Sequence, residues 1–336
     1  MAARNTPHPP TPSRPTMGPL DPHGPASGRG GDDVGVLPSP AHGGGAGGRG
    51  LPGRATPYIF SGAVVRQFRQ SRAAVVGLAL TVAFLLLALL APVLAPYDPT
   101  AFTLGQQLKP PSGTNLLGTD ELGRDILSRL LYGARITLLI TLGAVLVSLV
   151  VGTVLGIVAG FLGGWTDTLI MRLMDVLLAM PGFLLAIAII AALGAGTLNV
   201  VIAVGIFSVP AFARVARGST LSIKQQDYVL AARALGEPAG GIMWRHILPN
   251  VTPPLVVQTT LRLATAILTA SGLSFLGLGP QPPTPEWGAM LSTGRNMITS
   301  SPQLATIPGL AILLVAIGFN LLGDGLRDAL DPRMKR

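Results

Sequence analysis

Long apolar segments fill most of the sequence from about residue 73 onward, and short polar connections separate them. Several of these segments approach the ~20 residues that a helix needs to cross a bilayer. Because hydrocarbon cannot hydrogen-bond to backbone groups, a spanning segment of this kind must satisfy its own backbone as a helix. Hydrophobic residues make up 49% of the chain and charged residues 12%, unlike an ordinary soluble domain. The sequence therefore predicts an all-α polytopic membrane protein.

Six of these segments are predicted to be transmembrane helices. They cover about residues 73–95, 136–161, 173–193, 198–212, 252–278 and 304–322. Most of the 24 Lys and Arg residues lie before the first segment, after the second and fourth, and after the sixth. Basic residues next to a span favour its cytosolic side. We therefore expect a multi-pass protein of the cell membrane with both termini in the cytosol.

Residues 1–57 have a different composition, since they are rich in Pro, Gly and Arg and contain few apolar residues. A stretch of this kind buries too little apolar surface to fold on its own. We expect a disordered cytosolic tail, followed by a transmembrane domain over residues 58–336. The tail could be regulatory, could tether the chain to the membrane surface through its arginines, or could be tolerated length.

Composition also excludes several kinds of chemistry. The chain contains no Cys, which excludes disulfides, thiolate metal sites and cysteine nucleophiles. It lacks the P-loop, zinc-protease and serine-hydrolase motifs, so we expect no enzyme and no cofactor, and any ATP must be hydrolysed by another subunit. The net charge of +9 does not indicate nucleic-acid binding, because the basic residues flank apolar spans and do not alternate with aromatic ones.

The longest polar interruption between spans lies in the loop 217–250, which contains the run DYVLAARALGEPAGGIMWRHILPN. Apolar residues recur at helical spacing from Tyr228 onward, and Gly236 is expected to end that helix. A second short helix should follow and close at Pro249. Small alanines in the first helix would let another surface approach closely. The loop is thus predicted to be a docking unit, although two incidental helices in a cytosolic loop would show the same spacing.

A series of glycines in the second span, at Gly152, Gly156, Gly160 and Gly164, has a four-residue spacing. In lipid, such a ridge lets two helix backbones pack closely where hydrophobicity cannot drive their association. We expect the ridge to contact another helix, although membrane helices also contain incidental glycines. Before this span, a separate amphipathic helix capped by Thr119 is expected to lie along the outer surface.

Two charged residues lie within or near the spans. Asp175 is near the inner end of the third span, and we expect a water-facing or paired carboxylate rather than a proton relay. Arg262 is near the middle of the fifth span, where it should face a partner helix, a carboxylate or a watery cavity, in packing or in contact with substrate. Pro181 is expected to kink the third span. Trp287 suits the membrane interface, and Gly323 should break the last span.

The loop 217–250 resembles the cytoplasmic coupling loop of bacterial ABC importer permeases, whose pattern is Glu-Ala-Ala, three residues, Gly, nine residues, Ile, one residue, Leu-Pro. The matching positions are Ala231, Ala232, Gly236, Leu248 and Pro249. Two positions differ, because Leu230 stands where the family prefers Glu and His246 where it prefers Ile. The stretches LLGTDELGRDILSRLLYGAR, LSFLGLGPQPPTPEWGAML and FNLLGDGLRDALDPR narrow the resemblance to the second, C-type membrane subunit of dipeptide, oligopeptide and nickel importers.

The resemblance implies the type I ABC importer permease fold. Two homologous membrane subunits would form the pore, two ATPase subunits carrying ATP and Mg would bind the inner loops, and an extracytoplasmic binding protein would deliver the substrate. The chain would then form half of a translocation pore for dipeptides or oligopeptides. The residues that the resemblance assigns to the ATPase coupling loop are Asp227, Tyr228, Ala231, Ala232, Arg233, Gly236, His246, Leu248 and Pro249.

The alternative keeps the same machinery but changes the cargo to nickel or another small solute. A path for a metal chelate would be expected to carry His or acidic residues, and only Asp175 and Arg262 are charged within or near the predicted spans, which favours peptides. A membrane enzyme would need catalytic residues that the sequence lacks. A stand-alone channel would have no use for a loop that resembles an ATPase-docking unit.

Overall fold

The computed structural model describes residues 62–330, so the predicted disordered tail and residues 331–336 lie outside the described part of the chain. The elements are α1 (Gly62–Gln70), α2 (Arg72–Leu94), α3 (Ile126–Leu162), α4 (Gly164–Ala179), α5 (Gly182–Leu193), α6 (Thr197–Ile223), α7 (Asp227–Ala234), α8 (Ala239–Ile242), the π-helical segment η2 (Met243–Ile247), α9 (Leu248–Phe275), α10 (Trp287–Arg295) and α11 (Gln303–Leu330). Within residues 62–330, the only extended pairing is an isolated bridge between Thr119 and Asp125.

The predicted all-α membrane fold is confirmed. Five helices of the described chain are long and apolar enough to cross a membrane, namely α2, α3, α6, the run Ala239–Phe275 and α11. The predicted third span is the pair α4 and α5, which bend by 92° at a break next to Pro181. This pair supplies a sixth span if the two helices are counted together. The predicted kink is therefore present, because proline cannot continue the hydrogen-bond ladder of α4.

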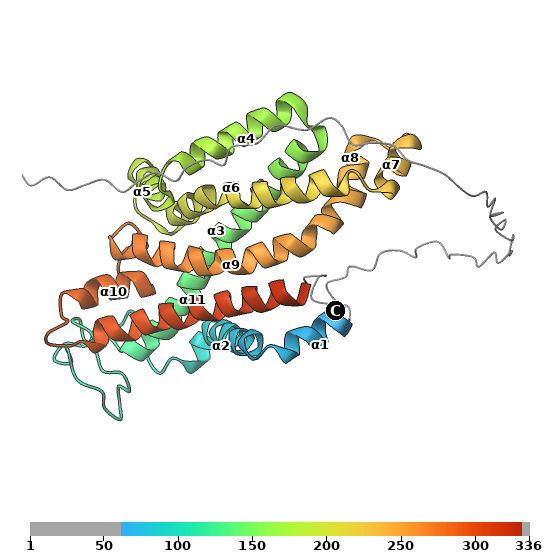
Figure 1. The fold of residues 1–336 in the computed structure, drawn as a ribbon. Coiled ribbons are helices and arrows are strands. Elements are labelled where there is room, and N and C mark those ends of the chain that lie inside the picture. The colour runs from blue at the N-terminus through green and yellow to red at the C-terminus, as the bar shows by residue number, and fades with distance from the viewer. Residues whose placement is uncertain (1–61, 331–336) are drawn as a thin grey trace, which may run out of the picture. The chain divides into compact units, whose positions relative to one another are not determined.

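Figure 1 shows which helix ends lie together. The helices α1, α7 and α8 and the C-terminal end of α11 lie at one end of the bundle, whereas α10 and the loop before α3 lie at the opposite end. The Gln67 side chain of α1 donates from Nε2 to the carbonyl oxygen of Asp328, near the end of α11, at 3.0 Å. Both ends of the described chain therefore lie on the same side as the predicted docking loop.

The glycine ridge of α3 packs against α6, as its spacing predicts. A Cβ atom at Gly152 would lie 2.6 Å from Cβ of Phe212, and one at Gly160 would lie 3.0 Å from the carbonyl oxygen of Arg217. Gly156 likewise faces the backbone of α6. Gly164 does not belong to the ridge, because it begins α4 and a Cβ there would meet nothing within 4 Å. The prediction is thus correct for three of the glycines and wrong for the fourth.

The start of α3 corrects the predicted outer helix. No separate helix begins at Thr119; instead α3 itself begins at Ile126, with Asp125 as its N-cap. One carboxylate oxygen of Asp125 accepts hydrogen bonds from both the backbone N and the hydroxyl of Ser128, each at 2.8 Å. The apolar stripe that predicted a surface helix therefore belongs to the first turns of the span, which begins ten residues earlier than expected.

The last span and the helix before it differ from the prediction at Gly323 and Trp287. The helix α11 continues through Gly323 to Leu330, so Gly323 does not break it. Gly323 instead admits the neighbouring helix, since a Cβ there would lie 2.8 Å from Cδ2 of Leu261 on α9. Trp287 is buried and not interfacial, and its indole Nε1 donates to the carbonyl oxygen of Leu130 at 2.9 Å. Gly323 thus marks a close contact between helices and not the end of one.

The predicted fourth span is also longer than expected. The helix α6 extends beyond Phe212 to Ile223, so its arginines lie on the helix and reach α4. Arg217 donates from Nε and Nη2 to the two carboxylate oxygens of Asp167, at 2.5 and 2.6 Å. Arg214 Nη2 lies 2.8 Å from Oδ1 of Asp175, which confirms a paired carboxylate at that position. These two pairs fix the inner half of α4 to α6.

Candidate functional site: an inner hairpin joined to a membrane span

The candidate site is the inner hairpin, which we define as Asp227–Pro249. Its first helix, α7, has Asp227 in its first turn, where a carboxylate interacts favourably with the helix dipole. The helix ends in a Schellman motif, because the backbone N of Gly236 bonds to the carbonyl of Arg233 at 3.0 Å and that of Glu237 to the carbonyl of Ala232 at 3.1 Å. Gly236 has a φ of 81°, in the left-handed region that favours glycine. The predicted end of the helix is confirmed.

The second half of the hairpin corrects the prediction for Pro249. This proline does not close a separate helix, because α8, η2 and α9 form one continuous helical run over Ala239–Phe275. The backbone N of Leu248 bonds to the carbonyl of Met243, which is a π-type turn. Proline normally clashes with the carbonyl four residues earlier, and a wider π turn just before it relieves that contact. The hairpin is therefore continuous with a membrane span.

Three of the apolar side chains that recur along the hairpin sequence help to hold the hairpin in place. Val229, Ile242 and Ile247 are all buried, one on α7 and two on the continuous helical run. They belong to the same hydrophobic core as buried residues of α3, α6 and α9, so the hairpin packs onto the spans through these side chains. Ile242 and Ile247 are five residues apart, which is one π-type turn, and both lie on the buried side of the helical run.

A charged contact closes the turn between the two halves. The Nε2 atom of His246 lies 2.9 Å from Oε2 of Glu237, and Nη1 of Arg245 lies 3.7 Å from Oε1 of the same residue. His246 is one of the two departures from the family pattern, and here it supplies the partner of Glu237. Glu237 was read only as part of the helix stop, so its role in joining the two halves was missed. These contacts make the hairpin a rigid unit.

The hairpin also packs against the inner end of α3. The guanidinium carbon of Arg233 lies 5.3 Å from the ring centroid of Phe161, at the distance of a cation–π contact. Just before the hairpin, Nζ of Lys224 donates to the carbonyl oxygen of Gly160 at 2.7 Å. A movement of the hairpin must therefore either move the end of α3 or break these contacts.

The remaining surface of α7 is open and partly apolar. Tyr228 is 45% exposed, Leu230 47% and Leu235 88%, and Ala231 between them is also exposed. Exposed apolar side chains that cluster outside the membrane mark a protein contact surface. Leu230, the second departure from the family pattern, adds an aliphatic side chain to this surface where the family prefers a carboxylate.

A largely apolar groove runs between α3 and α9 beside the hairpin. Its volume is about 360 Å³, and it is lined mainly by apolar residues together with Thr153, Thr252 and Thr259. Arg262 follows Thr259 by three positions on α9 and is partly buried. In residues 62–330 no acidic side chain forms an ion pair with Arg262, and Asp175 pairs with Arg214 instead. The two predicted charged residues are therefore not brought together.

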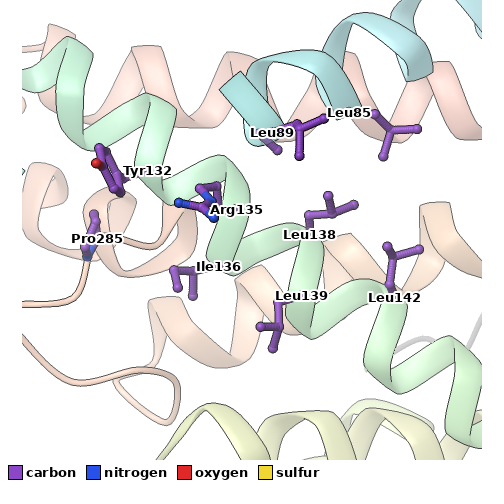
Figure 2. A pocket seen from close by; sticks show the side chains of 10 residues that line it. Leu85, Leu89, Tyr132, Arg135, Ile136, Leu138, Leu139, Leu142 and Pro285 are labelled. Atoms are coloured by element: carbon purple, nitrogen blue, oxygen red, sulfur yellow. The ribbon is translucent and has the colours of Figure 1, made fainter. Parts of the chain in front are cut away.

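A second groove, between α2 and α3, has a different character (Figure 2). It has a volume of about 580 Å³ and is lined mostly by leucines of the two helices, including Leu85, Leu89 and Leu142, with Tyr132 and Arg135 toward one end. Such a lining suits acyl chains or an apolar helix. Among the described residues, no group of three or more His, Asp or Glu side chains could hold a metal ion.

Comparison with known proteins agrees with this architecture. Residues 152–336 match the family model described as "Binding-protein-dependent transport system inner membrane component", and residues 60–111 match "N-terminal TM domain of oligopeptide transport permease C". The chain is 52% identical over 271 residues to the glutathione transport system permease protein GsiD of Shigella flexneri serotype 5b (strain 8401), and 50% identical to that of Escherichia coli O6:K15:H31 (strain 536 / UPEC). Each alignment covers 80% of this chain and 89% of the relative.

Proposed function

Because the chain belongs to the family of binding-protein-dependent transport system inner membrane components, we propose that it forms half of a translocation pore for short peptides. The chain is a multi-pass inner-membrane permease subunit of an ABC importer and is not an enzyme. Its family implies ATPase subunits, a substrate-binding protein and a second permease subunit as partners. ATP and Mg would then be held by the ATPase subunits.

The proposed cargo is a peptide of about three residues. The relatives that are 52% and 50% identical to this chain over 271 residues are named as glutathione transport system permease proteins, and glutathione is a tripeptide. This size lies between the dipeptides and the longer oligopeptides that the sequence suggested. The polar side chains on the exposed face of α9, Gln258, Arg262 and Thr265, support a modestly polar path, because backbone amides of a peptide need hydrogen-bond partners inside the membrane.

We further propose that the inner hairpin receives the movement of the ATPase subunits and passes it to α9. The observation that carries this proposal is the continuous helical run Ala239–Phe275, which begins in the hairpin and crosses the membrane. The contact between Glu237 and His246 ties α7 to this run, so that the hairpin moves as a rigid body. The exposed side chains Tyr228 and Leu230, together with Ala231, would form the surface on which an ATPase docks.

The experiment that tests both parts is peptide uptake in cells that lack this subunit. The cells are complemented with wild type, with Gly236→Val or with Gly240→Val, and receive labelled glutathione, a labelled tripeptide pool or nickel. Both glycines have free space around them, but only Gly236 has a positive φ, which a β-branched residue rarely adopts. We expect Gly236→Val to abolish uptake and Gly240→Val to retain it, at equal amounts of protein in the membrane.

Each outcome bears on one part of the proposal. If wild type restores only nickel accumulation, the peptide cargo is wrong while the family assignment stands. If Gly236→Val restores peptide uptake as well as Gly240→Val does, the hairpin does not need its present shape and the proposed coupling role is wrong.

A further inference from the structure

The helix α9 has an exposed face that differs from those of the other spans. Its partly or fully exposed side chains include Gln258, Thr259, Arg262 and Thr265. By contrast, the exposed face of α2 is made of valines and leucines, from Val75 to Leu94. A face toward lipid is expected to be apolar, because unpaired polar groups are costly in hydrocarbon. The polar face of α9 is therefore turned toward water or protein and not toward lipid.

Arg262 is the charged residue of this exposed face of α9. It lies near the middle of α9, which runs from Leu248 to Phe275, and its charge has no acidic partner among the described residues. Arginine side chains at the centre of a span almost always face a bundle interior or a water-filled cavity, where they meet a counter-charge. The chain provides no acidic partner for Arg262 in residues 62–330, which leaves its guanidinium available to a group of another molecule.

The groove beside the hairpin leads to this residue. Leu248 and Leu255 line the groove, and Arg262 follows Leu255 by seven residues, about two turns farther along the same face of α9. Thr252 and Thr259 accompany them on that side. The hydroxyls of Thr252 and Thr259 donate to carbonyls of their own helix, so a molecule that passed along this side of α9 would leave a largely apolar groove and then meet a guanidinium.

We propose that Arg262 binds the C-terminal carboxylate of the peptide as it crosses the membrane. This inference rests on the proposed peptide cargo. A guanidinium binds a carboxylate through two parallel hydrogen bonds, and every linear peptide with a free C-terminus carries that group whatever its side chains. A pore residue of this kind would favour peptides over neutral solutes without selecting a particular sequence. The competing source of a carboxylate is an acidic residue of the second permease subunit.

The test uses the complete importer, with its binding protein, in proteoliposomes. The substrate is a tripeptide chosen because wild type imports both its free acid and its C-terminal amide, each supplied at a concentration that saturates the binding protein. The variants are Arg262→Gln and Arg262→Lys. The matched control is Arg135→Gln, which makes the same change in the leucine-lined groove of Figure 2. Import rate and co-purification with the second permease subunit are measured for each.

We expect Arg262→Gln to slow import of the free acid about 10- to 100-fold, because a charged hydrogen bond is lost, and to change import of the amide less than about twofold. Arg262→Lys should restore part of the acid rate, and Arg135→Gln should behave as wild type. Equal losses for acid and amide, or an unchanged acid rate, would overturn the inference alone. Loss of the second subunit on purification would also overturn it, by assigning Arg262 to the interface between subunits. If wild type imports none of the tripeptides screened to choose this substrate, the proposed function and this inference are overturned together.

Discussion

The packing of α3 against α6 makes a sharp prediction for Gly152→Ala. The added Cβ would lie 2.6 Å from Cβ of Phe212 and 2.7 Å from the carbonyl oxygen of Val209. Because one of these neighbours is backbone, the two helices would have to separate by several tenths of an ångström. Overpacking of this kind costs about 1–3 kcal/mol. The substitution also gains about 0.5–1 kcal/mol, since alanine loses less backbone entropy than glycine in a helix.

The control Gly143→Ala separates these two effects. It lies on the same helix and also faces α6, but its Cβ would meet only the two methyl groups of Val201, Cγ1 at 3.2 Å and Cγ2 at 3.5 Å. Both variants receive the same gain in helix propensity, so Gly152→Ala should be less stable than Gly143→Ala by about 1–3 kcal/mol. Denaturant titration of each purified variant in detergent measures this difference in the free energy of unfolding. Equal free energies of unfolding would show that the close approach of α3 and α6 is not required.

Three further outcomes follow from single contacts. Burial raises the pKa of Glu286, the N-cap of α10, so the native state holds the carboxyl proton more tightly than the unfolded state does. Stability should therefore fall as pH rises above the ordinary carboxyl pKa. Thermal unfolding measured from acid to neutral pH should show this fall for wild type, and Glu286→Gln should remove it. Trp287→Phe loses the hydrogen bond to the carbonyl of Leu130 and should lower the free energy of unfolding by about 1–3 kcal/mol, measured by denaturant titration. Arg233→Ala loses the contact with Phe161, worth about 0.5–1 kcal/mol, and should lower the number of peptides imported per ATP while the protein stays folded.

The sequence predicts those features of this fold that depend on local physics. The length of the apolar segments predicts the spans, and the four-residue spacing of glycines predicts the contact between α3 and α6. Gly236, followed by Glu and Pro, predicts the end of α7. In each case the cause lies within a few residues of the effect. The docking unit could be proposed for the same reason, since its turn is encoded by Gly236 and its neighbours.

Two of the misses, at Gly323 and Trp287, depend on residues far apart in the chain, whereas those at Pro249 and Glu237 depend on how the hairpin folds locally. Pro249 was expected to end a helix, but a π turn lets the helix continue. Gly323 was expected to break α11, but it makes room for Leu261 of α9. Trp287 was assigned to the membrane interface, but it lies buried against α3. Glu237 and its partner His246 are nine residues apart and meet only once the turn has formed.

The continuity of the inner hairpin with α9 places a constraint on chain length that differs from any constraint on residue identity. Each residue of an α-helix turns the following side chains by about 100° around the axis. Insertion or deletion of one residue between Ile247 and Arg262 would keep both ends helical but would rotate the guanidinium by about 100° around the helix axis relative to the hairpin. The same change in the loop between α9 and α10 would alter no such angle. The number of residues between the hairpin and Arg262 therefore fixes the angle around the helix axis between the hairpin and the Arg262 side chain.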